Sequence, residues 1–543
     1  MRAIAAALGM ASLMASLIAG SAQAQTIYPI DRAEILAGSR FDLKVEFPGL
    51  VDPARLSVTL NGKPYREVFG RDGTLIEREA GLEQSALVLR DAELAAPGRY
   101  VVRASDGVHS ADVSWTVYGT GPRRAKNVIL FVGDGLSLAH RVAARILSKG
   151  MKEGKAHGRL AIDDMPHMAL VATAGSDSII TDSANSASAY ATGHKTASGA
   201  MGVYADRTRD PFDDPRVETI ASLVKRRLGL AVGVVTDTEI QDATPAAMVS
   251  HTRLRREYDR IVEHFFAARP DVILGGGLAN FLPKDAAGSK RKDEQDFVAR
   301  FRDAGYAYVT TAAELAAAKA ANNGKLLGLF NLGNMDGVLD RRFLKGGTVE
   351  RFPDQPDLTE QLGAALDVLS RNQAGFFLMV EAGMIDKYSH GLEMERAVYD
   401  TIMLDNAVKQ ARDWAGARGD DTLILVIADH SHNIGLAGTV DHDPDRKPDR
   451  PLHERVRIYA RAGFPNYPAP DAAGYPPSVD VSRRLAILSS TPRGSVHSAE
   501  DVILTATGPG SERVRGQLDN TEVFRVMVEA LGLGDPTTTA QGR

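Results

Sequence analysis

The sequence predicts a doubly wound α/β domain with a mainly parallel sheet and helices on both faces, preceded by a small all-β, immunoglobulin-like domain. Residues 128–132 form a continuous apolar run, which is typical of a parallel strand covered on both faces. Helical patterns separate this run from similar ones, as a doubly wound sheet requires. The similar runs are residues 230–235, 272–274, 376–380 and 423–427.

The all-β prediction covers residues 25–119. Apolar residues alternate with polar ones from Phe41 to Phe47, and Asn61-Gly62 and Asp106-Gly107 are turn signals. Several short strands separated by turns are typical of a small β-sandwich. This part carries no catalytic constellation, so both a spacer role and a binding or docking role stay open.

The first 24 residues predict a secretory signal peptide. Arg2 precedes an apolar run over residues 3–19, and Ala22-Gln23-Ala24 provides a small-x-small cleavage pattern. A membrane anchor is the alternative, but the run is short and ends in small residues. No later segment is apolar enough to span a membrane, so we expect a periplasmic or secreted protein.

Composition narrows the function further. The 543 residues include no cysteine, which excludes a lipoprotein thiol and a disulfide framework. The net charge of −5, without a basic block, argues against a nucleic-acid-binding surface. Residues 120–543 form the predicted α/β domain, and its segment 439–493 is proline-rich and reads as a loop-rich insertion near the site entrance.

Charged residues follow the predicted buried strands, where a desolvated charge is costly unless paired or bound to metal. Asp134 follows the first run, Glu381 follows the run ending at Val380, and Asp429-His430 follows another. In a doubly wound sheet, ligands collect at the carboxyl ends of the strands. An aspartate at a strand end can also merely cap a helix. Taken together, these residues predict a site for several metal ions.

Further candidates come from helices and loops. Asp386 and His390 are four residues apart, so on a helix they share one face, as two ligands of one ion must, although a simple Asp–His hydrogen bond is the alternative. His432 is expected to support the ligands, and His497 is isolated in sequence. Ser183 opens an Ala/Ser-rich helix that ends at Gly193, where it could simply cap the helix. Beside metal, however, its alkoxide would be favoured.

From Asn127 to Gly532 the chain resembles bacterial alkaline phosphatases. Besides the segments above, the motifs that carry the resemblance are Gln241-Asp242-Ala243-Thr244-Pro245-Ala246-Ala247, Arg255, Ile385-Asp386-Lys387 and the Glu500-Asp501-Val502 that follows His497. The resemblance implies two Zn²⁺ and one Mg²⁺, with eight protein ligands. These are Asp386, His390 and His497 for one zinc ion, Asp134, Asp429 and His430 for the second, and Asp134, Thr244 and Glu381 for magnesium.

The resemblance also implies a mechanism. Ser183 attacks the phosphorus of a phosphate monoester, and water hydrolyses the resulting phosphoserine. Arg255 grips the phosphate, although Arg253 and Arg256 are equivalent candidates without the family spacing. Asp242 and Lys387 match the family variant that carries this pair near the magnesium site. Asp242 would orient magnesium-bound water, and Lys387 would reach phosphate through water.

The expected substrates are therefore small-molecule phosphate monoesters, and a homodimer is a possible assembly. A phosphodiesterase of the same superfamily is the nearest alternative, while the absence of cysteine weakens a sulfatase. A catalytically inactive phosphate-binding or adhesion protein is the alternative from another class. Ser183→Ala discriminates between an enzyme and a binder, because only an enzyme would lose turnover.

Overall fold

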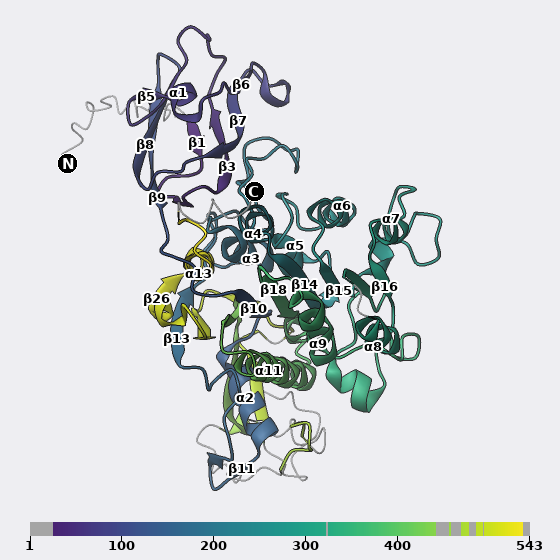
Figure 1. Ribbon diagram of the computed structural model, residues 1–543. Coiled ribbons are helices and arrows are strands. Elements are labelled where there is room, and N and C mark those ends of the chain that lie inside the picture. The colour runs from purple at the N-terminus through teal and green to yellow at the C-terminus, as the bar shows by residue number, and fades with distance from the viewer. Residues whose placement is uncertain are drawn as a thin grey trace, which may run out of the picture.

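A computed structural model of the chain describes residues 25–321, 324–440, 456–457, 469–476, 485–491 and 493–535. A strand-rich N-terminal part lies at one end of a larger part that is built on a long sheet (Figure 1). The predicted signal peptide and most of the predicted insertion lie outside the described residues. None of the described helices is long and apolar enough to cross a membrane.

The large part contains a mixed sheet of ten strands, which confirms the predicted mainly parallel α/β fold. The first seven strands in spatial order are parallel, β25 is antiparallel to both of its neighbours, and the last two strands are parallel to each other. In spatial order they are β16 (Ala307–Val309), β17 (Leu326–Leu329), β15 (Val272–Gly276), β14 (Ala231–Glu239), β18 (Phe376–Ala382), β10 (Asn127–Gly133), β19 (Thr422–Ala428), β25 (Val502–Thr507), β13 (His167–Ala172) and β26 (Arg515–Asp519).

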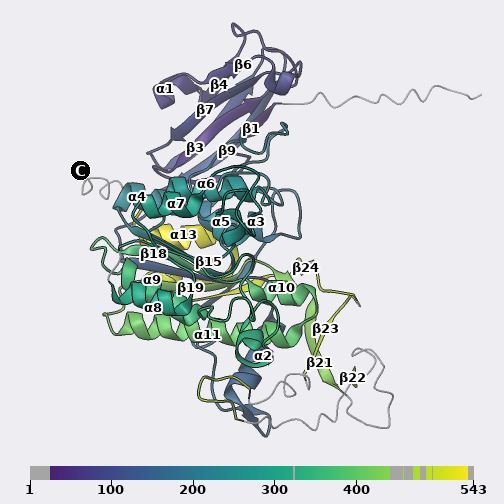
Figure 2. The same ribbon diagram turned by 90° about the vertical axis from the view of Figure 1, so that its right-hand side faces the viewer.

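Helices cover both faces of this sheet (Figure 2). The face toward the N-terminal part carries α3 (Ser183–Thr192), α4 (Ile220–Leu228), α5 (Ala243–Ala247), α6 (Tyr258–Ala268), α7 (Phe297–Asp303) and α13 (Thr521–Ala530). The opposite face carries α2 (Leu138–Lys149), α8 (Ala312–Ala320), α9 (Leu358–Leu369) and α11 (Met394–Gly416). The short helix α10 (Met384–His390) follows β18.

Strand register explains why charged residues from distant segments meet. Residues 128–132 of β10 are completely buried, as the apolar run predicts, and burying each such side chain contributes about 1.5–3 kcal/mol. Gly133 at the end of β10 pairs with Ala382 of β18 and with Ala428 of β19. The three central strands therefore end at the same level of the sheet, and the residues that follow them share one edge.

The N-terminal part folds as two sheets around one apolar core. Trp115 is fully buried there and meets Phe41 edge-on, with ring centroids 5.5 Å apart. The first sheet contains β1 (Thr26–Tyr28), β3 (Arg40–Glu46), β7 (Ala86–Glu93) and β6 (Thr74–Ile76). The second contains β2 (Glu34–Leu36), β9 (Ser110–Tyr118), β8 (Gly98–Ser105), β4 (Ser57–Leu60) and β5 (Lys63–Pro64).

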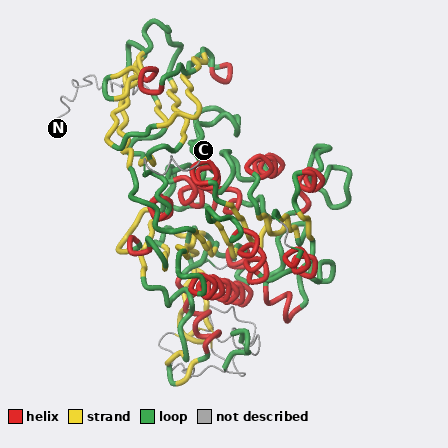
Figure 3. The backbone as a smooth tube through the Cα atoms, in the orientation of Figure 1, coloured by secondary structure: helices red, strands yellow, loops and turns green. Residues whose placement is uncertain are grey.

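Strands dominate this part, which also has one short α-helix, α1 (Tyr65–Phe69), and a 3-10 helix at Glu79–Gly81, whereas helices surround the long sheet (Figure 3). Its immunoglobulin-like character and the domain boundary at residue 119 stay predictions. The remaining strands of the described chain are short or flank the site. They are β11 (Met151–Lys152), β12 (Lys155–Ala156), β20 (Ser431–His432), β21 (Ile434–Val440), β22 (Val456–Arg457), β23 (Leu485–Ser489) and β24 (His497–Ser498).

Candidate active site

The residues that follow the central strands form a buried acidic cluster. Asp134 follows β10, and Asp429 and His430 follow β19; at most 2% of each is exposed. The Nε2 atom of His430 lies 3.3 Å from Asp134 Oδ1 and 3.3 Å from Asp429 Oδ2. Three possible ligand atoms thus converge from two adjacent strand ends, close enough to share one ion.

A second cluster is centred on Asp386 of α10. Its Oδ1 lies 3.3 Å from His390 Nε2, 3.5 Å from His497 Nε2 and 2.7 Å from His432 Nε2. The predicted helical i,i+4 pair is therefore formed, and His497 joins it from a distant loop. The four side chains can offer atoms to one ion, because these atoms lie within 4.8 Å of one another.

Hydrogen bonds to the other ring nitrogen fix how these histidines point. His390 Nδ1 lies 2.9 Å from the Ser495 carbonyl, and His497 Nδ1 lies 2.8 Å from the Thr181 carbonyl. A carbonyl only accepts, so each Nδ1 carries a proton, and Nε2 is the nitrogen that can bind a metal ion or, without one, a second proton that it shares with Asp386. His432 differs, because its Nδ1 contacts the Ser495 hydroxyl at 2.8 Å and its Nε2 is already bonded to Asp386.

Ser183 is the first residue of α3, as predicted, and α3 ends at Gly193 in the left-handed conformation (φ 77°). The preceding Asp182 caps the helix, because its side chain accepts a hydrogen bond of 2.6 Å from the backbone N–H of Ala184. Ser183 is therefore free of the capping role. Its Oγ lies 3.3 Å from His430 Nε2 and 3.5 Å from Asp134 Oδ1, at the edge of the acidic cluster.

Two buried oxygen atoms at the site have no hydrogen-bond partner. They are Thr244 Oγ1, on α5, and Asp429 Oδ2. A buried polar atom without a partner costs about 1–3 kcal/mol, more when charged. Glu381, completely buried at the end of β18, accepts hydrogen bonds from the hydroxyls of Thr236 and Thr238. An all-oxygen set with an orphaned hydroxyl and a buried carboxylate fits a hard cation.

Two cations line the site beside Asp242. Arg255 Nη2 lies 2.9 Å from Asp242 Oδ1, and Lys387 Nζ lies 3.0 Å from Asp242 Oδ2. Lys387 also lies 3.5 Å from Asp386 Oδ2. Arg255 Nη1 lies 3.5 Å from Asp182 Oδ1, next to Ser183. The carboxylate of Asp242 thus fixes both cations at the site.

The structure gives the three neighbouring arginines, which only the family spacing separates in the sequence, different surroundings. Arg253 is bound to Asp206 and Asp214, which belong to neither of the clusters around Asp134 and Asp386. Arg256 is exposed. Arg255 is therefore the one of the three that contacts other predicted site residues.

The cluster perturbs its own acid–base equilibria. Burial, together with the charges of Asp386 and Asp429, raises the pKa of Asp134 to about 7. Burial and the charge of Asp134 raise the pKa of Glu381 well above its usual range. For His497, burial is the largest influence and acts to lower the pKa, but the hydrogen bonds to Asp386 and to the Thr181 carbonyl, together with the charges of Asp386 and Asp429, outweigh it, and the pKa rises to about 9. A concentration of buried negative charge therefore retains protons here unless another cation takes their place.

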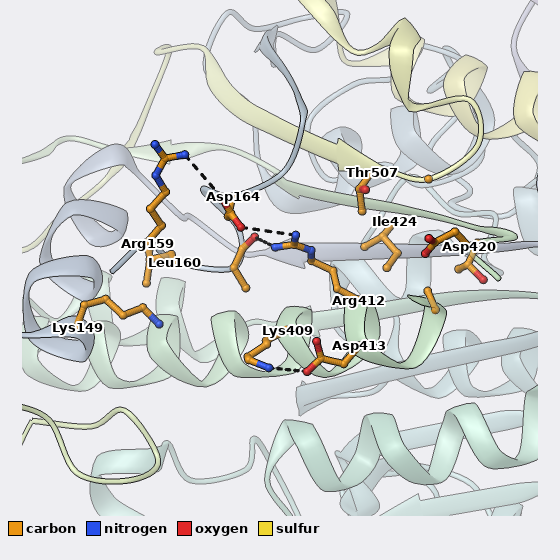
Figure 4. A pocket seen from close by; sticks show the side chains of 14 residues that line it. Lys149, Arg159, Leu160, Asp164, Lys409, Arg412, Asp413, Asp420, Ile424 and Thr507 are labelled. Atoms are coloured by element: carbon orange, nitrogen blue, oxygen red, sulfur yellow. Dashed lines mark hydrogen bonds and ion pairs between the residues drawn. The ribbon is translucent and has the colours of Figure 1, made fainter. Parts of the chain in front are cut away.

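A separate cavity of about 600 Å³ lies at the opposite edge of the sheet, lined by the start of β19 and the end of β25 (Figure 4). Five of its charged side chains pair with one another. Arg159 and Arg412 lie 3.7 Å and 3.8 Å from Asp164, and Lys409 lies 2.5 Å from Asp413. None of the predicted site residues lines this cavity.

Several supporting residues escaped the sequence prediction. Thr236 and Thr238 lie just beyond the predicted apolar run 230–235, but β14 continues through them, and Thr236 pairs in register with Glu381, so their hydroxyls reach its carboxylate. Ser495, which orients two histidines, lies just before His497 in a loop with no local pattern. The alternating Thr-x-Thr at a strand end was the available signal for the first pair, because side chains two apart share a face.

The fold and the site together define an α/β protein with a buried cluster of possible metal ligands at the carboxyl ends of its parallel strands. The family model for alkaline phosphatase matches residues 125–533, so the chain belongs to the alkaline phosphatase family. The alkaline phosphatase of Escherichia fergusonii is 33% identical over 75% of this chain and 86% of the relative. The alkaline phosphatase of Escherichia coli K12 is 32% identical over 75% of this chain and 86% of the relative.

Solved structures agree on the fold. Thermus thermophilus alkaline phosphatase is 27% identical, with a TM-score of 0.58 over 76% of this chain and 93% of that one. The alkaline phosphatase of the Antarctic bacterium TAB5 is 23% identical, with a TM-score of 0.57 over 76% of this chain and 99% of that one. The protein is thus a phosphomonoesterase, and membership implies that divalent metal ions bind its site. The family match begins at residue 125, after the N-terminal strand-rich part.

Proposed function

We propose that the protein hydrolyses phosphate monoesters through a phosphoserine on Ser183. The carrying observation is the position of Ser183 Oγ at the first turn of α3, within 3.5 Å of both Asp134 and His430. The helix N-terminus favours an alkoxide and a bound phosphate. Because Asp182 already caps α3, a capping role does not explain the serine.

The centre is proposed to hold two Zn²⁺ and one Mg²⁺. The residues fit, because histidine-containing sets suit zinc and an all-oxygen set suits magnesium. The zinc sets are Asp386, His390 and His497, and Asp134, Asp429 and His430; the magnesium set is Asp134, Thr244 and Glu381. When bound, the ions supply the positive charge that stabilises the serine alkoxide and the leaving oxygen. His432 is proposed to hold Asp386 in place through their 2.7 Å hydrogen bond.

The remaining polar residues orient the phosphate. Arg255 presents two guanidinium N–H groups, a geometry that matches two phosphate oxygens. Asp242 binds Arg255 at 2.9 Å and Lys387 at 3.0 Å, so one carboxylate fixes the positions of both cations. Lys387 is proposed to reach phosphate through water. A monoester has three non-bridging oxygens and a diester has two, so the guanidinium fork can bind either, and the choice of a monoester rests on the family match.

Covalent labelling tests the nucleophile. Wild-type protein incubated with a ³²P-labelled monoester and quenched in acid is expected to carry label on Ser183, and Ser183→Ala is expected to carry none and to lose most turnover. A binder without catalysis would be unaffected by the change. Turnover by Ser183→Ala at the wild-type rate would overturn the nucleophile assignment.

The diester alternative is tested by rates on p-nitrophenyl phosphate and bis(p-nitrophenyl) phosphate. We expect faster monoester hydrolysis, and faster diester turnover would overturn the choice of substrate. Elemental analysis of purified protein is expected to give two zinc and one magnesium per chain. A different ratio would contradict the assignment of ions.

The location of the protein is part of the proposal. We infer a periplasmic or secreted enzyme whose first 24 residues are removed, on the basis of the apolar run and the Ala22-Gln23-Ala24 pattern. Mass spectrometry of the protein from a secreting host is expected to show Gln25 as the first residue. A retained Met1 in the secreted fraction would contradict signal cleavage.

A homodimer is proposed for the assembly of the protein, and sedimentation at micromolar concentration tests it.

A further inference from the structure

The N-terminal strand-rich part meets the large part through buried charges. Lys44 of β3 is the centre of this contact, since only 2% of its side chain is exposed. Its Nζ contacts Asp206 of the large part, Glu79 at 2.6 Å and Glu46 at 3.5 Å. The three carboxylates form a set that could hold a metal ion, but the ammonium group already occupies the place of the cation. Lys44 therefore acts as the internal counter-ion of this contact.

Arg207 reinforces the same contact from the other side. Its guanidinium donates to Glu79 at 2.7 Å, to the Phe47 carbonyl at 2.6 Å and to the Ser85 carbonyl at 2.8 Å. Every one of these acceptors belongs to the N-terminal part. An arginine with so many fixed donors in one direction holds segment 206–208 rigidly against that part.

The segment held in this way is bound in turn to Arg253. Asp206 accepts a hydrogen bond of 2.8 Å from Arg253 Nη2 through Oδ1, and another through its backbone carbonyl. Asp214 accepts one of 2.9 Å from Arg253 Nε. Arg253 is thus enclosed by residues 206–214, and its own backbone is fixed two residues before Arg255.

Backbone hydrogen bonds continue the connection to Arg255. Met201 and Thr252 exchange two bonds of 2.8 Å and 2.9 Å, and the N–H of Arg255 donates to the Gly199 carbonyl at 2.9 Å. The N-terminal part contacts the same layer directly, because Asp42 exchanges hydrogen bonds with the backbone of Arg216. The loop that carries Arg255 is therefore built against segments that the N-terminal part holds.

We propose that the N-terminal part positions Arg255 for phosphate binding, with Lys44 as the principal positioning residue. The inference rests on the proposed phosphate-binding role of Arg255. Lys44 touches neither substrate nor the reacting atoms, and it acts through Asp206 and Arg253. Loss of its charge leaves Asp206 facing Glu46 and Glu79 without the ammonium group between them, and Asp206 is then expected to move away from the two glutamates and to shift Arg253, to which it stays bound. The N-terminal part is accordingly an integral element of the phosphate site, not a detachable spacer.

The test is a double-mutant cycle in the full-length, metal-loaded protein, with Lys44→Met, Arg255→Ala and the combination. Lys44→Met is expected to raise KM and the inhibition constant for inorganic phosphate by roughly tenfold, with little change in kcat, because a small displacement of a positioning group weakens phosphate contacts. In the Arg255→Ala background the same change is expected to have less than about a twofold effect, because the two residues act as one unit. Lys44→Arg, which keeps the charge, is expected to restore most of the affinity.

A control breaks another contact between the same two parts. Arg525 of α13 binds Glu34 at 3.1 Å, and Glu34→Gln removes this pair without touching residues 199–255. Glu34→Gln is expected to leave KM and phosphate inhibition unchanged. If it raises both as Lys44→Met does, the effect reflects general loosening and the inference is overturned.

A second variant covers the case in which Lys44→Met does not fold. Arg90 is 42% exposed, so its loss perturbs the core less, yet it donates to the Asp213 carbonyl at 2.7 Å and to the Asp214 carbonyl at 3.0 Å. Arg90→Met is expected to show the same KM effect and the same non-additivity. Full additivity with Arg255→Ala, for either variant, overturns the positioning role. An Arg255→Ala enzyme with unchanged KM would instead overturn the proposed role of Arg255 itself.

Discussion

Removal of the metal ions is expected to make folding stability fall as pH rises from 6.5 to 9, and His497 supplies the clearest contribution. Without bound metal its Nε2 faces Asp386 at 3.5 Å, and this contact, the Thr181 carbonyl and the charge of Asp429 together raise the pKa of His497 to about 9, against the burial that lowers it. A histidine whose pKa is raised on folding contributes stability that is fully present below its unfolded pKa, near 6.5. That stability is lost as pH rises through 9.

The magnitude follows from the size of the shift. A pKa displaced from 6.5 to about 9 corresponds to about 3 kcal/mol, at about 1.4 kcal/mol per unit. Glu381 and His390, whose pKa values are also raised, act in the same direction. His430 and His432 have lowered pKa values, so their opposite contribution is complete by about pH 6.5 and does not enter this window. A loss of about 3 kcal/mol is a large share of the roughly 5–15 kcal/mol that stabilises a typical domain.

Urea unfolding at pH 6.5, 7.5 and 9 in excess chelator measures this loss. The same series with zinc and magnesium is expected to stay flat or to rise with pH, because metal binding requires neutral imidazole and competes with the proton. His497→Gln is the matched control, since it cannot titrate, and it is expected to flatten the chelated series by about the predicted amount. Equal or greater stability of the stripped wild type at pH 9 would refute the reasoning.

Three further substitutions test phosphate binding, magnesium binding and core packing separately. Arg255→Ala is expected to raise the inhibition constant for phosphate by about 10–100-fold, as for lost hydrogen bonds to a charged group, and an unchanged constant in a steady-state assay would contradict its role. Thr244→Val removes a buried hydroxyl without a partner, so the stripped protein should unfold no more easily, whereas the magnesium concentration that half-activates the enzyme should increase. Leu130→Ala is expected to cost about 2–5 kcal/mol in urea unfolding without changing KM, and a KM effect would show that the core reaches the site.

The hydrophobic pattern of the sequence was sufficient to predict the central strands of the sheet. The five continuous apolar runs correspond to β10, β14, β15, β18 and β19, because strands buried on both faces need apolar residues at every position. The strands beyond β19 lack this signal. In β13, Met168 and Leu170 are about half exposed, so alternation at the sheet margin hides a strand that belongs to the same sheet.

The site residues were predictable in type but not in arrangement. Asp134 and Asp429 stand where buried strands end, and burial alone marks them as unusual. Residue type alone did not choose Arg255 over Arg253, and the family spacing did; the structure adds the contacts of Arg253 with Asp206 and Asp214, which lie about forty residues away in sequence. Periodicity carries no information on such long-range ion pairs. The docking of the N-terminal part through Lys44 was unpredictable for the same reason, since Lys44 and Asp206 are 162 residues apart.

The arrangement of the acidic residues explains why this fold positions its ligands so firmly. Four carboxylates meet at one edge of the sheet, and their mutual repulsion would drive them apart if their backbones were mobile; they are Asp134, Glu381, Asp386 and Asp429. Paired strand ends and the first turn of α10 hold them instead, and Lys387 and Arg255 offset part of their charge. The negative charge that these two cations do not offset destabilises the site and favours the binding of further cations. The folding free energy that the buried core supplies therefore offsets the repulsion among these carboxylates, and the relief of that repulsion adds to the binding free energy of cations.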